Sequence, residues 1–269
     1  MASAFKNRFA IVGAGVMGEA LLLSIIRSGI DVLNIVISDK KSERTAELTS
    51  KYGCQSLALE QIASSFENIL LVVKPRDMDS LLESIGKTIS VGQRVVSFVA
   101  GKKTSAIEKY LAEGVAVLRV MPNTPMSVGI GLSAISAGRY ASREDVKAVE
   151  ELLKASGKTI VVDESLQDAV TATSGSGPAY FFRFVEAMIS GARDLGLSES
   201  DAKTLVIQTI TGAAAMLNVE GASPSKLREN VTSPNGTTFA ALQVFESLDI
   251  EGIIKKAMRA ARDRSQELS

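Results

Sequence analysis

The sequence of 269 residues contains no histidine, and this absence removes a large class of mechanisms. Without an imidazole, neither a Ser-His-Asp nor a Cys-His arrangement can form, and the usual ligands of a zinc site are missing. We therefore expect no metal site. The single cysteine, Cys54, allows no disulfide within the chain, and we expect it to be a small buried hydrophobic side chain. If the protein is an enzyme, its protons come from hydroxyls, carboxylates, lysines, water or the substrate.

The sequence also lacks net charge, because 30 basic residues balance 30 acidic ones. A protein that binds nucleic acid needs a basic surface, so the composition argues against that class. No apolar run approaches the roughly 20 residues of a membrane span, and residues 1–8 lack the apolar core of a secretory signal. The sequence therefore predicts a cytoplasmic protein without a membrane partner.

The N-terminal part of the chain alternates short apolar runs with amphipathic stretches. Runs rich in β-branched residues predict strands at 9–12, 33–37, 69–73, 94–99 and 116–120. Amphipathic stretches predict helices at 16–27 and 42–52, the second with Glu43, Arg44 and Glu47 pointing outward. Continuous apolar strands separated by helices indicate a parallel sheet that is covered on both faces.

The C-terminal part is helical by its periodicity, with helices predicted at 179–195, 198–217 and 239–247. Ser198 is placed to cap the second of these helices, and Ser176 the first. The stretch 206–216 is nearly free of charge, and so apolar a helix is buried on most sides. A small helical domain rarely buries such helices alone, so we expect a second subunit to cover it.

The fold class that follows is α/β. An N-terminal Rossmann-type, doubly wound, mostly parallel sheet is predicted over residues 1–164, and an all-helical dimerisation domain over residues 165–269.

A glycine-rich turn joins the first predicted strand to the first predicted helix. Gly13-Ala-Gly15-Val16-Met17-Gly18 has the pattern G-x-G-x-x-G. The first glycine permits the tight turn, the second lets a pyrophosphate approach the backbone, and the third lets helix and strand pack closely. The helix start adds free N–H groups and a positive dipole end. In this context the turn predicts a dinucleotide site, and the six-residue segment is its phosphate-binding part.

Further cofactor contacts are expected where the other strands end, because ligands of such sheets bind outside the carboxyl ends. The second strand is followed by Ser38, Asp39 and Lys40, at the position that reads the ribose. An acid there favours the 2′-hydroxyl of NADH and a base the 2′-phosphate of NADPH, so the residues leave the coenzyme open. The remaining predicted contacts follow the later strands: Val73, Lys74, Pro75, Ala100, Met121 and Asn123.

A turn that leads into a helix occurs at Ser233-Pro-Asn-Gly236-Thr237-Thr238. The N–H groups of Gly236, Thr237 and Thr238 would form an anion site of a size suited to a small carboxylate. The hydroxyls of Ser233 and Thr238 add hydrogen-bonding groups for a polar atom beside that carboxylate. A threonine cap after an ordinary turn explains the same residues equally well.

Taken together, the segments 13–18, 73–75, 119–125, 174–180 and 233–238 resemble the pyrroline-5-carboxylate reductases, in the order in which that family has them. The resemblance implies reduction of a cyclic imine carboxylate, Δ1-pyrroline-5-carboxylate, to L-proline with NADPH or, alternatively, NADH. It also implies a homodimer with interleaved helical domains that assembles into a higher homo-oligomer. By matching position, it implies that Thr238 is the catalytic residue at the ring nitrogen, that Gly236 and Thr237 hold the carboxylate, and that Glu164 lies beside the substrate.

Three positions depart from the family pattern. Asn235 stands where glycine is usual, Val99 where alanine is common, and Asp39-Lys40 where a polar or arginine pair is more usual. Three alternative functions remain. One is a related reductase that acts on another imine, such as a six-membered ring. The β-hydroxyacid dehydrogenases resemble this architecture, but they carry a lysine where this chain has Phe181. A non-catalytic NAD(P)-sensing protein is the third alternative, and only turnover separates it from an enzyme.

Overall fold

The computed structural model describes residues 8–267. The chain divides into two compact units, the sheet unit (Met1–Ser176 and Ala261–Ser269) and the helical unit (Gly177–Ala260). The predicted division was into a dinucleotide-binding domain (1–164) and a helical domain (165–269), and this assignment of function to the two parts stays a prediction.

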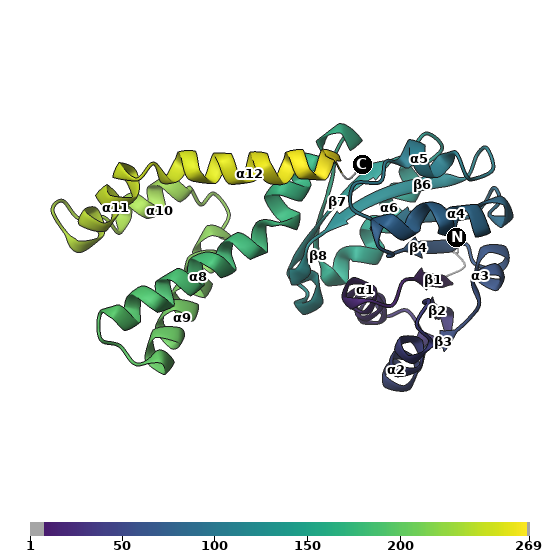
Figure 1. The fold of residues 1–269 in the computed structure, drawn as a ribbon, viewed down its shortest axis with the longest axis horizontal. Helices are drawn as coiled ribbons and strands as arrows, with labels where there is room; N and C mark the ends of the chain where they lie inside the picture. Colours follow the sequence, from purple (N-terminus) through teal and green to yellow (C-terminus); the bar gives the residue numbers. More distant parts are fainter. Residues whose placement is uncertain (1–7, 268–269) are drawn as a thin grey trace. The chain divides into compact units, whose positions relative to one another are not determined.

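The sheet unit is built on a sheet whose described strands number eight and follow the order β3-β2-β1-β4-β5-β6-β7-β8 (Figure 1). Neighbouring strands are parallel except β6 and β7, which are antiparallel. The first six strands have the order of a doubly wound dinucleotide-binding sheet, so the predicted fold class is confirmed. The strands are β1 (Phe9–Val12), β2 (Ile35–Ser38), β3 (Gln55–Ser56), β4 (Asn68–Leu71), β5 (Arg94–Ser97), β6 (Ala116–Pro122), β7 (Gly131–Ala137) and β8 (Gly157–Val161).

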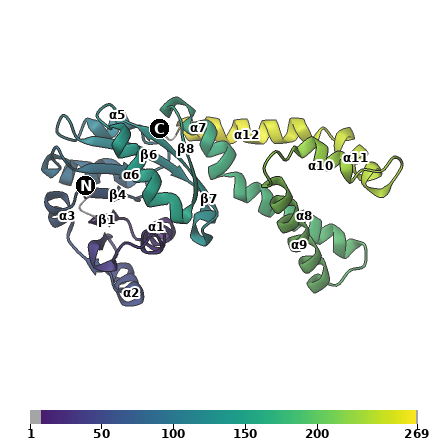
Figure 2. The ribbon, with the colours of Figure 1, turned by 180° about the vertical axis from the view of Figure 1, so that it is seen from behind.

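Helices cover both faces of this sheet, as the two opposite views in Figures 1 and 2 show. The helices of the sheet unit are α1 (Val16–Arg27), α2 (Ser42–Tyr52), α3 (Leu59–Ser65), α4 (Met78–Ile85), α5 (Thr104–Glu108), α6 (Arg143–Leu153) and α7 (Gln167–Val170). Side chains of α1, α2 and α6 pack in one apolar cluster, and those of α3, α4 and α5 in another. In β1, Phe9 and Ile11 belong to the first cluster, whereas Ala10 and Val12 belong to the second. Because the central strands are buried on both sides, they appear in the sequence as continuous apolar runs.

The predicted strands exist, but several ends differ. The strand expected at 33–37 begins at Ile35, because Val32–Asn34 forms a 3-10 turn in which the Asp31 carboxylate accepts the Leu33 N–H at 3.0 Å. The strands expected at 69–73 and 94–99 end at Leu71 and Ser97. Three strands were not predicted: β3, β7 and β8. β3 has only two residues, both polar. β7 and β8 begin with glycine and include serine or lysine among their apolar residues, so they lack both the continuous apolar pattern and strict alternation.

The helical unit begins with α8 (Gly177–Asp194) and α9 (Glu199–Leu217), close to the predicted ranges. Ser198 caps α9 as predicted, with its hydroxyl accepting the Asp201 N–H at 3.1 Å. The expected cap by Ser176 is wrong. A π-helical turn, Thr171–Gly175, connects α7 directly to α8, and the Ser176 N–H donates to the Thr171 carbonyl at 2.8 Å. Ser176 therefore lies at a bend between the two helical segments, with helical backbone angles in place of the extended conformation of an N-cap.

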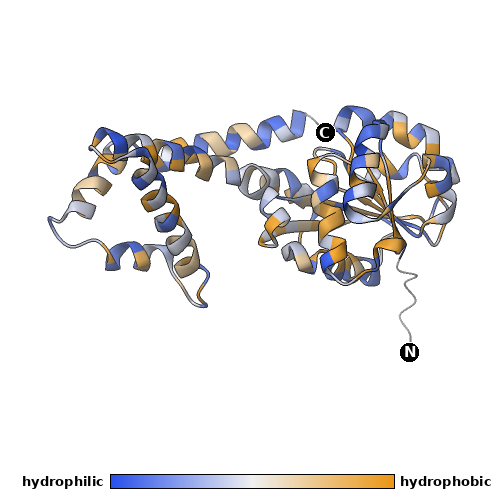
Figure 3. Ribbon diagram, turned by 90° about the horizontal axis from the view of Figure 1, so that it is seen from below, coloured by the Kyte–Doolittle hydropathy of each residue, from blue (hydrophilic) through white to orange (hydrophobic). Residues whose placement is uncertain are grey.

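The remaining helices are α10 (Pro224–Asn230), α11 (Thr237–Ser247) and α12 (Ile250–Glu267), whose last turns belong to the sheet unit. Within residues 177–260, only Gly177, Ala202 and Val206 are buried. Large apolar side chains stay exposed on several helices; Phe182 on α8 is 63% exposed and Leu205 on α9 is 54% exposed. In Figure 3 these helices carry apolar segments along their length. The helical unit of one chain therefore does not enclose a core of its own.

Candidate cofactor and substrate sites

All the residues predicted to contact a cofactor lie at one edge of the sheet. Strands β1, β2, β4, β5 and β6 are mutually parallel, so their carboxyl ends meet there. The glycine-rich turn follows β1, the Ser38–Lys40 segment completes β2, and the other predicted residues follow β4, β5 and β6 or end β6. The topology thus brings together positions that are far apart in the sequence.

The glycine-rich turn has the geometry that a pyrophosphate requires. Gly13 has φ of 109°, and a Cβ there would lie 2.5 Å from the Val72 carbonyl oxygen. A Cβ on Gly18 would lie 2.0 Å from the carbonyl oxygen of Gly13, so α1 packs against the turn at van der Waals limits. Around Gly15, by contrast, a Cβ would meet no described atom within 4 Å. The backbone is therefore open at the position where phosphate oxygens have to approach, and the turn fits a dinucleotide.

Two charged side chains hold the peptide of Ala14 in the middle of this turn. The Asp39 carboxylate accepts the Ala14 N–H at 2.7 Å, and the Arg44 guanidinium donates to the Ala14 carbonyl at 2.8 Å. The other Asp39 oxygen accepts the Lys41 N–H at 2.9 Å. The predicted outward position of Arg44 is therefore wrong. Arg44 lies in the first turn of α2, from which its long side chain reaches back to the phosphate-binding turn.

Glu19, in the first turn of α1, completes this arrangement. Its carboxylate pairs with Arg44 and accepts hydrogen bonds from Tyr52 at 2.7 Å and Lys51 at 2.9 Å. The hydrogen bonds from Tyr52 and Lys51, together with Arg44, lower the pKa of Glu19 from 4.5 to about 2. Glu19 therefore stays ionised across the physiological range. No local sequence pattern indicates these roles of Glu19 and Arg44, because the contacts join residues 25 and 30 positions apart.

A small cavity of about 100 Å³ lies beside the turn, between the ends of β1, β2 and β4. Predicted residues form most of its wall: Gly13, Ser38, Asp39, Lys40 and Val73. Val12 and Leu59 complete it and were not predicted. At its rim, the Lys40 ammonium group pairs with the Asp77 carboxylate at 2.9 Å. Asp77 ends the short 3-10 turn Pro75–Asp77 that follows Lys74.

The end of β6 is fastened to the π-helical turn. The Asn123 side chain accepts the Leu132 N–H at 2.8 Å and donates to the Ser174 hydroxyl at 3.1 Å. A Cβ on Gly175 would lie 2.5 Å from the terminal methyl carbon of Met121, so a larger residue at this position would have to displace the end of the Met121 side chain. Met121 and Asn123 are half-buried and face the segment that leads into α8. The two predicted cofactor residues at the end of β6 are thus held against this turn, and their contact with a cofactor stays a prediction.

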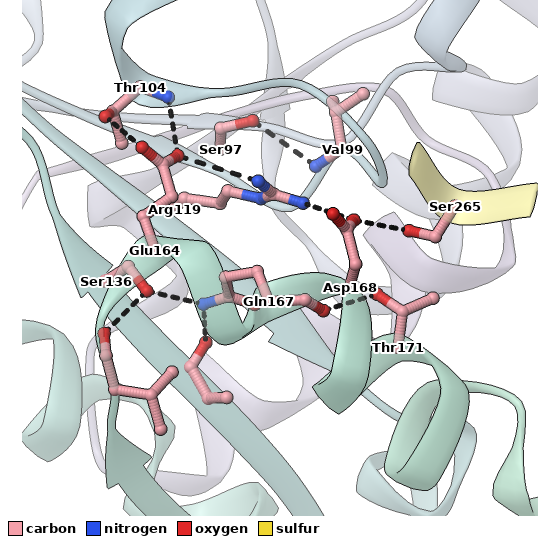
Figure 4. Close-up of polar contacts among 12 residues, drawn as sticks. Ser97, Val99, Thr104, Arg119, Ser136, Glu164, Gln167, Asp168, Thr171 and Ser265 are labelled. Carbon is pink, nitrogen blue, oxygen red and sulfur yellow. Dashed lines mark hydrogen bonds and ion pairs between the residues drawn. The ribbon is translucent and has the colours of Figure 1, made fainter. Parts of the chain in front are cut away.

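Glu164 belongs to a buried ionic network in the sheet unit (Figure 4). Its two carboxylate oxygens accept the N–H and the hydroxyl of Thr104, at 2.7 and 2.8 Å. Arg119 of β6, only 3% exposed, lies between Glu164 at 3.6 Å and Asp168 at 3.9 Å. Asp168 also accepts the Ser265 hydroxyl at 2.7 Å, which fastens the end of α12 to this network. Both oxygens of Glu164 are therefore bound within the protein.

In the turn before α11, the Gly236 N–H was expected to be free for an anion, but the turn itself uses it. Asn235 has φ of 58°, and the Gly236 N–H donates to the Ser233 carbonyl at 3.0 Å. Pro234 followed by a residue of positive φ is the pattern of a type II turn, in which asparagine replaces glycine at moderate cost. This turn uses the Gly236 N–H. The N–H groups of Thr237 and Thr238, in the first turn of α11, have no acceptor within the helix, and no other residue in the described range 8–267 accepts them.

Other expectations concern groups outside these sites. Cys54 is buried, and burial raises the pKa of its thiol, as expected for a small core residue. In the part of the chain that the structure describes, histidine, cysteine and acidic side chains form no cluster able to hold a metal ion. None of the helices in residues 8–267 is long and apolar enough to cross a membrane.

The sheet order and the glycine-rich turn define a dinucleotide-binding protein of the Rossmann type. Residues 8–101 match the family described as NADP oxidoreductase, coenzyme F420-dependent, and residues 164–268 match that of pyrroline-5-carboxylate reductase dimerisation. The pyrroline-5-carboxylate reductase of Corynebacterium melassecola is 40% identical over 96% of this chain and 97% of its own length. That of Methanosarcina acetivorans is 38% identical over 98% of both. The chain belongs to the pyrroline-5-carboxylate reductase family.

Solved structures agree with this assignment. A pyrroline-5-carboxylate reductase of Coxiella burnetii has a TM-score of 0.91 and 32% identity, with 97% of this chain and 98% of that chain covered. The reductase of Plasmodium falciparum, solved with NADP bound, has a TM-score of 0.88 and 27% identity over 97% of both chains.

Proposed function

We propose that this protein reduces the C=N bond of Δ1-pyrroline-5-carboxylate to give L-proline, the last step of proline biosynthesis, with NADPH as the principal coenzyme and NADH as a second one. When bound, the coenzyme supplies the hydride. The observation that carries the proposal is the presence in one chain of two complementary binding elements. One is a phosphate-binding turn open at Gly15, and the other is a helix start with free N–H groups at Thr237 and Thr238.

At the phosphate end, we assign the whole predicted set to coenzyme binding: Gly13, Gly15, Val16, Met17, Gly18, Ser38, Asp39, Lys40, Val73, Lys74, Pro75, Ala100, Met121 and Asn123. The geometry of the glycine turn and the shared edge of the sheet support this assignment. Asp39 has a second role there, because its carboxylate braces Ala14.

At the substrate end, we assign the carboxylate to the N–H groups of Thr237 and Thr238, at the positive end of α11. Gly236 and Ser233 contribute by holding the type II turn that aims these groups. The hydroxyl of Thr238 is assigned to the ring nitrogen, which it positions by a hydrogen bond. The imine is basic enough to arrive protonated, so the absence of histidine is no obstacle. We also keep Glu164 as a residue beside the substrate, as the family resemblance implies, and its carboxylate accepts two hydrogen bonds from Thr104.

The exposed apolar side chains of α8, α9 and α11 support a homodimer in which the helical units cover each other. We propose further association of such dimers into a higher oligomer in the cytoplasm. The matched dimerisation family supports the first of these steps.

The test is turnover. Purified protein is mixed with Δ1-pyrroline-5-carboxylate and NADPH or NADH, and loss of the nicotinamide absorbance is followed. Thr238→Val should lower kcat about 100-fold with NADPH affinity unchanged, because the threonine hydroxyl positions the ring nitrogen and supports it as its charge changes during reaction. Thr237→Val, which keeps its N–H, is the matched control and should stay within a factor of about 3. Equal turnover by Thr238→Val and the wild type would remove Thr238 from the mechanism, and coenzyme binding without any turnover would favour the sensor.

A further inference from the structure

The ion pair between Lys40 and Asp77 lies at the rim of the cavity that the proposed function assigns to the adenosine end of the coenzyme. Lys40 follows β2, at the position where a ribose 2′-substituent is read. Asp77 reaches it from the turn after β4, and the two groups are 2.9 Å apart. The pair therefore joins two of the strand ends between which the coenzyme has to bind.

The carboxylates of Asp39 and Asp77 both disfavour the binding of a phosphate group beside them, because like charges repel. Asp39 is fixed, because its oxygens accept the N–H groups of Ala14 and Lys41. Its negative charge therefore remains beside the ribose position whichever coenzyme binds. A 2′-phosphate needs a cation to offset that charge, and Lys40 is the cation on the cavity wall. That cation is already paired with Asp77, and the hydrogen bond from Lys40 lowers the pKa of the Asp77 carboxyl.

We propose that Asp77 determines coenzyme specificity by competing with the 2′-phosphate of NADPH for Lys40. The inference rests on the proposed function, whose coenzyme site it refines. NADH carries a hydroxyl in place of the phosphate, so it binds without disturbing the pair. NADPH has to draw Lys40 away from Asp77 or share it. Asp77 thus lowers the preference for NADPH and keeps NADH usable.

The size of the effect follows from the exposure of the pair. The Lys40 side chain is 72% exposed and that of Asp77 is 31% exposed, so solvent screens their attraction. Removing the Asp77 charge should therefore change the preference by a factor of roughly 3 to 10. Substitution of Lys40 removes the cation for which the 2′-phosphate and the Asp77 carboxylate compete, so Asp77 should then have no effect on the preference.

The experiment measures binding of two fragments that differ only in the 2′-phosphate: adenosine 2′,5′-bisphosphate and 5′-AMP. Their dissociation constants are measured by calorimetry, and the ratio of AMP to bisphosphate constants reports the preference. In Asp77→Asn this ratio should rise about 3- to 10-fold. Asp79→Asn is the matched control, because Asp79 lies two residues further on and pairs with Lys102 at 2.6 Å instead of Lys40. Its ratio should stay within a factor of about 1.5.

A double-mutant cycle makes the test specific for the pair. Lys40→Met should lower the ratio about 10-fold, and Asp77→Asn should have no further effect in that background. An unchanged ratio in Asp77→Asn, or an equal rise in Asp79→Asn, overturns the proposal, as does a full Asp77 effect without Lys40. Because no imine is present, these outcomes are independent of turnover. The expected ratios without any reductase activity would leave the inference standing and reject the proposed function.

Discussion

The sheet unit and the helical unit stabilise themselves in opposite ways. The sheet unit buries two apolar clusters on the two faces of its sheet, and the central strands have almost no exposed side chain. The helical unit buries three residues and leaves phenylalanine, leucine and isoleucine side chains exposed. Secondary structure is equally regular in both. The difference teaches that regular helices do not imply a closed core, and that the stability of the second unit depends on what covers it.

The largest expected effect comes from placing a charge on the open apolar surface of the helical unit. Phe182→Asp should weaken self-association by a factor of about 10,000 or more, because a buried charge in a subunit interface is strongly unfavourable. Sedimentation velocity measures it. Val91→Asp is the control, since Val91 is 67% exposed in the sheet unit and should tolerate the change. Equal effects of the two substitutions on self-association would contradict the view that the helical unit, and not the sheet unit, forms the subunit interface.

The second prediction concerns the buried ions of the sheet unit. Arg119→Met leaves Glu164 and Asp168 without their shared cation, and should cost about 3 to 5 kcal/mol of unfolding free energy. Urea denaturation measures the loss, which should not depend on protein concentration because the network lies within one unit. Adding Glu164→Gln and Asp168→Asn to Arg119→Met should restore part of the stability. A loss that disappears at high protein concentration would contradict this account.

The third prediction separates packing from binding within one turn. Gly18→Ala should destabilise the protein by about 3 kcal/mol, because its Cβ would overlap the Gly13 carbonyl. Gly15→Ala should leave the unfolding free energy within about 0.5 kcal/mol and weaken NADPH binding about 10-fold or more, since the methyl group occupies the open side of the turn. Thermal unfolding and fluorescence titration report the two quantities. Normal NADPH affinity in a folded Gly15→Ala protein would count against the phosphate site.

The smallest expected effect is on acid stability. Hydrogen bonds from Tyr52 and Lys51, with Arg44, lower the pKa of Glu19 from 4.5 to about 2 in the folded protein. A lowered carboxyl pKa stabilises the fold above the unfolded value, and this contribution is lost as the pH falls from about 4.5 towards 2. After allowance for solvent screening, we expect about 1 kcal/mol. Urea titrations at pH 7 and pH 3 should show a smaller loss in Glu19→Gln than in the wild type, and parallel losses would refute the role of Glu19.

Much of this architecture was predictable from the sequence, and the reason is physical. Strands buried on both faces are apolar throughout, so β1, β2, β4, β5 and β6 were found, and the rule that ligands bind at carboxyl ends then placed the cofactor edge. β7 and β8 escaped because Gly131 and Gly157 begin them and serine and lysine interrupt them. These two segments form strands because β7 pairs with β6 and β8 pairs with β7 in the folded sheet.

For the candidate sites, the sequence indicated which residues lie there. It did not indicate which hydrogen bonds their individual atoms make within the protein. Asp39 was expected to read a ribose, and its carboxylate also braces Ala14. Gly236 was expected to offer its N–H to a ligand, but the type II turn with Asn235 consumes it. These two hydrogen bonds depend on the folded backbone, and the composition and spacing of residues do not predict them.

The hydrogen bond from Ser265 to Asp168 has a topological consequence. It attaches the end of α12 to the sheet unit, so the helical unit leaves that unit at Ser176 and returns to it at Ala261. The helical unit is thus a closed insertion, anchored at both ends. A protease that cuts the α10–α11 connection should leave two fragments that stay together through the sheet unit. Closing the loop also lowers the entropy that this unit can gain on unfolding, a benefit that a free C-terminal tail would not have.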